Sequence, residues 1–382
     1  MEHKDTPSEI KDQEQLKLIN SNNKLRNIKS NFILKKLFDY LHKRKSLEII
    51  RYNNSIQKRI NININHYKEY SEKYSSIEIE IKPMKNKYGS FIDLEMQKKQ
   101  YFHIYYNDNR KEEIKSTSLN ENDKVSKINI IIDHQVKSFW GLFQFCECIE
   151  SIYFKKFFRN NITDMSWMFC ECSSLKELNL NNFNTINVIN MKYMFHKCSS
   201  LKELNLKNFN TNNVTDMSVM FSGCSSLNEL NLNNFNTNNV TDMSWMFNRC
   251  SSLKELNLNN FNTINVINMK GIFHKCSSLK ELNLNNFNTN NIINMSWMFC
   301  DCSLLNELNL NNFNTINVIY MSDMFHKCSS LKELNLNNFN TINVTDMKYM
   351  FSKCSDELKL KIKSKFNKFE EAAFKDSKYD LD

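Results

Sequence analysis

The chain is poor in the two residues that most often shape turns, since its 382 residues include only four glycines and two prolines. Loops that cradle phosphate groups depend on glycine, and no P-loop, G-x-G-x-x-G, G-x-S-x-G or H-E-x-x-H motif is present. We therefore predict no catalytic residues, no cofactor and no enzymatic activity. Another residue must make the turns, and asparagine, which tolerates left-handed backbone, is the visible candidate.

Long apolar runs are also missing, because no stretch approaches the ~18 residues that a transmembrane helix needs. The opening segment MEHKDTPSEIKDQEQ is polar and shows no secretory signal. We expect a cytoplasmic location, where thiols stay reduced, with the cell surface by a non-classical route as the alternative. Most of the net charge of +9 lies before residue 131, and we interpret it as a solvated lysine-rich face without specific nucleic-acid binding.

What the chain does contain is a repeat of 26 residues that begins near residue 136 and recurs about nine times. Two columns mark it. The Met column is Met165, Met191, Met217, Met243, Met269, Met295, Met321 and Met347, and the Cys column is Cys146, Cys172, Cys198, Cys224, Cys250, Cys276, Cys302, Cys328 and Cys354.

Each repeat contains two apolar patterns. The spacing i, i+3, i+4, i+7 is occupied in one repeat by Met243, Met246, Phe247 and Cys250, which predicts a short helix. The L-x-x-L-x-L segment from Leu253 to Leu258 alternates and predicts a short strand. We therefore predict an α/β repeat fold, a leucine-rich-repeat-like solenoid of about nine coils, each with one short parallel strand and one short helix. A small α+β region precedes it, and a C-terminal cap helix closes it.

The whole unit F-N-T-x-N-V-T-D-M-S-x-M-F-x-x-C-S-S-L-x-E-L-N-L-N-N is more specific than its leucines. It resembles the BspA-like leucine-rich repeat family, also described as the DUF285 or Mycoplasma lipoprotein repeat, over about residues 136–362. The resemblance implies a solenoid that binds partners, often on bacterial or protist surfaces. The chain departs from that pattern because it shows no signal peptide and no lipoprotein cysteine near its start.

The rest of the chain divides by composition. We predict a disordered N-terminus at 1–24, a helical segment at 25–75, a β-rich region at 76–135 that caps the solenoid, the solenoid at 136–362, and a capping helix and tail at 363–382. The strand predictions in the β-rich region rest on the alternation in SIEIEIK and on the runs YFHIYY and KINIIID.

The helical segment is faintly similar to an F-box, a module that docks to a ubiquitin-ligase scaffold. The matching positions are Ile33, Leu34, Leu37, Phe38 and Leu41 on one helical face and Leu47, Ile49 and Ile50 after a cap at Ser46. The usual Leu-Pro opening and the Trp near the end are absent. The resemblance implies a Skp1-like partner through residues 25–62, and the alternative is a helical pair that packs against the N-terminal region.

The Cys column falls on the same face as Met and Phe, so we predict that these thiols are buried, reduced and packed in the core. Disulfides and zinc are the alternatives, since a second column, two residues earlier, also holds His and Cys. The zinc candidates are His274, Cys276, Cys300, Cys302, His326 and Cys328. Because residues at i and i+2 of a helix face different ways, we predict no metal site.

Two further columns are candidates for binding a protein partner. The residue two after the Met column varies too much for a core, and we predict that it faces outward; its aromatic members are Trp167, Tyr193, Trp245, Trp297 and Tyr349. The alternative is that these rings lie flat on neighbouring coils. A row of glutamates, one per predicted strand, forms an acidic stripe suited to a basic partner or only to solubility, with Glu229, Glu255 and Glu281 at its centre.

Three functions remain open from the sequence. The first is a non-enzymatic scaffold that binds a protein of unknown identity along the solenoid surface. The second is an F-box-type adaptor that recruits substrates to a ubiquitin ligase. The third is a BspA-like surface adhesin, as the family resemblance implies.

Overall fold

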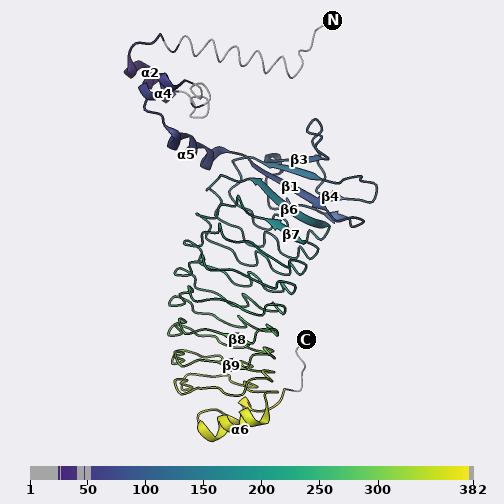
Figure 1. Ribbon diagram of the computed structural model, residues 1–382, viewed down its shortest axis with the longest axis vertical. Coiled ribbons are helices and arrows are strands. Elements are labelled where there is room, and N and C mark those ends of the chain that lie inside the picture. The colour runs from purple at the N-terminus through teal and green to yellow at the C-terminus, as the bar shows by residue number, and fades with distance from the viewer. Residues whose placement is uncertain (1–24, 26, 41–46, 48–52, 378–382) are drawn as a thin grey trace. The chain divides into compact units, whose positions relative to one another are not determined.

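A computed structural model describes residues 25, 27–40, 47 and 53–377 of the chain (Figure 1). The chain divides into two compact units, Met1–Ser75 and Ser76–Asp382, which are described separately. The predicted disordered segment 1–24 and the end of the predicted tail lie outside the described residues. No helix in the described part of the chain is long and apolar enough to cross a membrane.

The first unit contains the helices α2 (Asn31–Tyr40), α4 (Asn54–Arg59) and α5 (Ile64–Tyr74). A small core joins α2 to α4 through Leu34, Phe38, Ile56 and Ile60. Of the predicted apolar face, Ile33 and Leu37 are exposed instead. The positions Leu41, Ser46, Ile49 and Ile50 lie outside the described residues, so the F-box resemblance stays a prediction.

The second unit begins with a five-stranded sheet in the order β3-β5-β1-β6-β7. Its strands are β1 (Ile77–Pro83), β3 (Phe102–Tyr106), β5 (Ile128–Ile132), β6 (Ile149–Lys156) and β7 (Glu177–Asn179). The pair β2 (Gly89–Ser90) and β4 (Ser118–Leu119) and the 3-10 turn η1 (Lys99–Tyr101) lie between them in sequence. Alternate residues of β1 are buried, as its period-two pattern requires, so the strands expected in this region are confirmed.

The sheet changes from antiparallel to parallel pairing between β6 and β7, where Ser151 pairs with Glu177. From there onward each repeat pairs with the next at a spacing of 26 residues (Figure 1). Parallel bridges run from Ser138 through Asp164, Asn190, Asp216, Asp242, Asn268, Asn294 and Tyr320 to Asp346. The short strands β8 (Glu281–Leu282) and β9 (Glu307–Leu308) pair in the same way. We refer to residues 136–355 as the repeat stack.

The predicted fold class is wrong, because the repeat stack contains no helix and only short strands and bridges. In one repeat Trp245 and Arg249 both have a φ of +58°, and every other repeat has left-handed residues at the same two places. A right-handed helix cannot continue through such residues. The Met-Met-Phe-Cys positions are buried all the same, because a series of turns brings them to one side.

The hydrogen bonds explain this backbone. The amides of Met246 and Cys250 donate within their own repeat, to carbonyls three residues earlier, at 3.3 and 3.1 Å. The amides of Trp245 and Phe247 donate instead to carbonyls of the next repeat, at 2.8 and 3.0 Å. Successive N–H groups therefore alternate between closing a turn in their own repeat and bonding to the next repeat. In an α-helix every N–H group would instead donate to the carbonyl four residues earlier.

The stack ends at α6 (Asp356–Lys365) and the 3-10 turn η2 (Glu371–Ala373). Ser355 caps α6 by accepting from the amide of Leu358 at 3.2 Å. The carbonyls of Ala372 and Ala373 accept from the amides of Tyr349 and Phe351, each at 2.9 Å. The C-terminal segment thus takes the place that the next repeat occupies elsewhere.

Candidate functional site

The glutamate row lies on the surface of the repeat stack in register. Its members are Glu177, Glu203, Glu229, Glu255, Glu281, Glu307 and Glu333, and all are exposed. Glu177 accepts a hydrogen bond from the hydroxyl of Tyr153 at 2.8 Å. The other six have no ion-pair partner in the part of the chain that the structure describes. These carboxylates are therefore available to a partner.

Asparagines flank the glutamates and link neighbouring repeats on the same surface. The amide of Asn257 donates to that of Asn233 at 3.2 Å, and Asn283 donates to Asn259 at 3.2 Å. The carbonyl oxygen of Asn257 accepts from the backbone amide of Asn259 at 3.1 Å and so closes a turn. The amide groups are thus used within the stack, which leaves the carboxylates as the groups that a partner can pair with.

The row ends beside α6 in a groove of about 770 Å³. Glu307 and Glu333 line one side of it, and Lys361, Ile362 and Phe366 line the other. Lys361 pairs with Glu357 at 2.8 Å. The groove combines two exposed carboxylates with a wall that carries both lysine and apolar side chains.

The variable aromatic column is half-buried rather than fully exposed. Trp167 stacks on Tyr193 with ring centroids 4.1 Å apart and planes at 8°. The ring of Trp245 covers Gly271, where an added Cβ would lie 2.4 Å from it. Val219 and Asp323, in the same column, are buried. These rings contact neighbouring repeats, and a role in partner binding for any aromatic member of the column stays a prediction.

The Cys column faces the core, as predicted. Cys250 is buried, and its thiol donates to the carbonyl of Phe221 in the preceding repeat at 3.1 Å. The same bond recurs at Cys172, Cys198, Cys224, Cys276, Cys302, Cys328 and Cys354. All of these cysteines are free, and burial raises the pKa of Cys276 to about 12, so the thiols are protonated and unreactive.

The zinc candidates separate into two sets. Cys276, Cys302 and Cys328 belong to the core-facing column, with their thiols bonded to phenylalanine carbonyls. His274, Cys300 and His326 occupy the column two residues earlier. Ligand atoms of His274, Cys300 and Asp301 lie within 4.8 Å of one another. Sequence reasoning missed Asp301, although it stands inside the CDC segment that drew attention to the cysteines.

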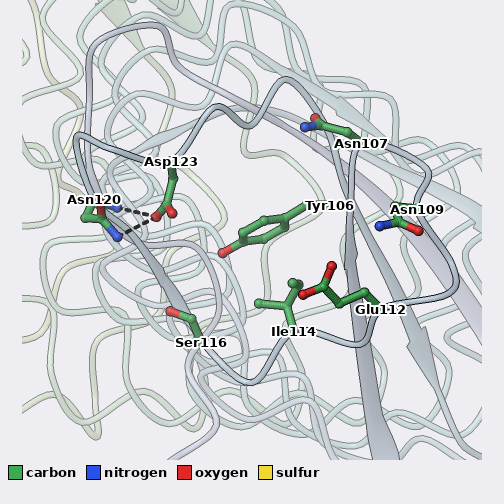
Figure 2. Close-up of a pocket in the computed structure, with 8 residues that line it drawn as sticks. All are labelled: Tyr106, Asn107, Asn109, Glu112, Ile114, Ser116, Asn120 and Asp123. Atoms are coloured by element: carbon green, nitrogen blue, oxygen red, sulfur yellow. Dashed lines mark hydrogen bonds between the residues drawn. The ribbon is translucent and has the colours of Figure 1, made fainter.

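A polar pocket in the sheet region was not predicted (Figure 2). The Tyr106 ring crosses it, and burial raises the pKa of this phenol to about 12. Asp123 on one side accepts from the backbone amide and side-chain amide of Asn120 at 2.8 and 2.7 Å, while Glu112 lies on the other (Figure 2). The phenol stays protonated and can donate a hydrogen bond, but the lining offers no activated nucleophile.

Comparison with protein families matches three overlapping segments of the chain, residues 137–256, 163–283 and 241–364. All three match one family, described as "Mycoplasma protein of unknown function, DUF285". The segments together cover more than half of the chain and coincide with the repeat stack. No curated protein and no solved structure matches.

Proposed function

Since the chain belongs to the DUF285 family of repeat proteins, we propose that it is a non-enzymatic scaffold that binds a basic protein partner along the glutamate row. The observation that carries this proposal is the run of exposed carboxylates, one from each successive repeat, of which those from Glu203 to Glu333 form no ion pair with any described residue. Stacked like charges repel one another, and an approaching cationic segment relieves that repulsion.

The geometry favours an extended partner segment. Neighbouring strands of a sheet lie about 4.8 Å apart, so the row offers a carboxylate at each such step. Glu281 and Glu307 are direct neighbours in a parallel pair. Lysine or arginine side chains on one partner segment could engage several of these carboxylates at once. Such contacts speed association and weaken with added salt.

Neutralising the centre of the row tests the proposal. The triple variant Glu229→Gln, Glu255→Gln, Glu281→Gln should weaken binding of a fluorescent lysine-rich peptide by about tenfold at low salt, with a smaller difference at high salt. Fluorescence anisotropy measures the affinity. The matched control neutralises three exposed glutamates of the sheet region, Glu95, Glu112 and Glu121, and so makes the same change in net charge.

An equal loss of affinity in both triple variants would mean that only net charge matters, and the proposal would fail. Circular dichroism shows whether each variant keeps its fold.

The location and the ubiquitin-ligase alternative need tests of their own. We propose a cytoplasmic location, and digestion of the protein by protease added to intact cells would favour a surface adhesin instead. The ubiquitin-ligase adaptor requires capture of a Skp1-like protein by the full chain. Leu34 is a buried core residue of α2, so loss of capture in Leu34→Ala could result from unfolding of the helical unit. The exposed residue Ile33 is therefore the better site to mutate.

A further inference from the structure

Three side chains from two neighbouring repeats converge on one side of the repeat stack. A ring nitrogen of His274, the sulfur of Cys300 and a carboxylate oxygen of Asp301 lie within 4.8 Å of one another. His274 and Cys300 are 6% and 1% exposed, whereas Asp301 is half-buried and borders a surface groove. The cluster is therefore buried on the protein side and reachable from solvent through Asp301.

The imidazole of His274 is held in one orientation by a chain of polar contacts. Its Nδ1 lies 2.7 Å from Oδ1 of Asn248, and Nδ2 of Asn248 donates to Oγ of Ser222 at 2.8 Å. Because the Asn248 amide uses its NH₂ group on Ser222, its oxygen accepts, and Nδ1 of His274 must carry the proton. The lone pair is then on Nε2. Many metal-bound histidines have the same arrangement, in which one ring nitrogen donates to a polar partner and the other binds the metal.

This free nitrogen is buried without a partner. Nε2 of His274 has no hydrogen bond among the described residues. A buried acceptor without a donor costs free energy unless something occupies its lone pair.

We propose that His274, Cys300 and Asp301 bind a Zn²⁺ ion through one nitrogen, one sulfur and one oxygen atom, with water at the fourth position. Mixed N, S and O donors suit zinc, and three protein ligands with one open position is a recurrent arrangement. Ligand atoms around tetrahedral zinc lie roughly 3.3–3.8 Å apart for ordinary bond lengths, so small side-chain rotations complete the geometry.

The charges balance in the bound state. Zn²⁺ replaces the proton of the Cys300 thiol, which leaves to solvent, so the thiolate and the Asp301 carboxylate together offset the two positive charges. Burial and the charges of Asp301 and Asp323 raise the pKa of the Cys300 thiol, and Lys275 and Lys327 oppose this only in part, so the bound metal itself must displace the proton. Lys327 also sits 4.0 Å from Asp301, from which the metal must displace it.

A second set of Cys, Glu and His, four repeats nearer the N-terminus, does not converge in this way and supplies the control. Cys170 and His196 occupy the column of His274 and Cys300 with the two residue types exchanged, and Glu171 follows Cys170. Lys197 already pairs with Glu171 at 2.8 Å, and the three do not converge among the described metal-ligating groups. No asparagine stands in the place that Asn248 takes beside His274.

Cobalt titration of the full-length, chelator-treated protein tests the site. Wild-type protein should bind about one equivalent of Co²⁺ and show a thiolate-to-cobalt charge-transfer band, which Zn²⁺ removes by competition. Cys300→Ser should abolish the band. Asn248→Ala should keep the band and weaken Zn²⁺ binding by about 10–100-fold, because it releases the orientation of His274. Cys170→Ser with His196→Ala should change neither quantity.

The proposal is overturned if wild-type protein shows no band, if the band survives Cys300→Ser, or if the control variant loses it as well. Circular dichroism of each variant confirms that a lost band reflects a lost ligand rather than unfolding. Glutamate-row variants should leave the titration unchanged, so this test is independent of partner binding.

Discussion

The antiparallel sheet of β1, β3, β5 and β6 and the repeats that follow β6 satisfy their backbone amides in different ways. In the sheet, antiparallel strands pair across long stretches of sequence, as β1 does with both β5 and β6. In the stack, alternate amides close turns inside one repeat, and the others reach the next repeat. The sheet therefore depends on distant segments meeting, whereas each repeat depends on its two neighbours.

The two regions also differ in what their backbone demands of a residue. Strand residues have extended conformations that favour β-branched and aromatic side chains. Each repeat, in contrast, needs two left-handed residues, and these are Trp245 and Arg249 in one repeat and Trp297 and Asp301 in a later one. A repeat can thus place large or charged side chains where glycine would be the easiest choice.

The largest effect is expected from removing a stacked phenylalanine. Phe247 is fully buried and stacks on Phe221 and Phe273 with centroids 5.9 Å away on each side. Phe247→Ala should lower the free energy of unfolding by about 3–5 kcal/mol in urea denaturation. Hydrogen exchange should show the loss concentrated in the adjoining repeats, and equal loss in β5 would contradict the nearest-neighbour description.

A smaller effect, of opposite sign in the two regions, concerns pH. Burial, with the nearby charge of Asp346, raises the pKa of Asp323 to about 6, above the ~3.9 of an unfolded chain. The folded state therefore holds this proton more tightly, and stability is lost as pH rises from about 4 through 6. Asp323→Asn should stabilise the protein at pH 7.5 by about 1–2 kcal/mol, after allowance for solvent screening, and by almost nothing at pH 4.

Glu150 in β6, the strand where the antiparallel sheet meets the first repeats, provides the control for this titration. Lys82 and Lys176 pair with Glu150 at 2.7 and 3.2 Å and hold the pKa of its carboxyl below the usual value. The ionised Glu150 carboxylate therefore stabilises the folded state at neutral pH, and this contribution to the free energy of unfolding is lost on acidification. Thermal melts of Glu150→Gln should therefore converge with wild type at low pH, and convergence of Asp323→Asn at high pH instead would refute the assigned direction.

The smallest effect compares glycine with alanine at one site in each region. At Arg249, with its φ of +58°, Gly should be more stable than Ala by about 1–2 kcal/mol, because a left-handed residue with a Cβ is strained. At Tyr105 in β3, Ala should be more stable than Gly by about 0.5–1 kcal/mol. Both variants at a site lose the contacts of the native side chain, so this loss cancels when their free energies of unfolding are compared. The same sign at both sites would remove the distinction between the regions.

In the sheet region the period-two apolar pattern was sufficient to predict the strands. In the repeats the helical spacing of apolar residues predicted helices that the structure does not contain. Period-two alternation in residues 77–83 has few explanations other than a strand. The spacing of Met243, Met246, Phe247 and Cys250 fits a helix and a series of turns equally well, because either backbone would bury these same residues. Glycine usually reveals left-handed backbone, and here Trp and Arg occupy those positions.

The candidate sites show the same limit. The glutamate row follows directly from the period, because a residue repeated every 26 positions lines up once the repeats stack. The His274 cluster does not, because the helix assumption directed residues two apart to different faces. With alternate amides joining repeats, Cys300 and His274 become neighbours across the stack, and Asp301 joins them through its left-handed backbone.

The sequence by itself determined the repeat period, the identity of the buried columns and the strands of the first sheet. The reason is that the spacing of apolar residues decides which side chains can be buried together. Only the tertiary structure decided which carbonyl each repeat amide meets. That choice depends on the neighbouring repeat, whose carbonyls compete with those of a local helix and capture every second N–H group. The same choice turned the predicted helix into turns and brought His274, Cys300 and Asp301 together.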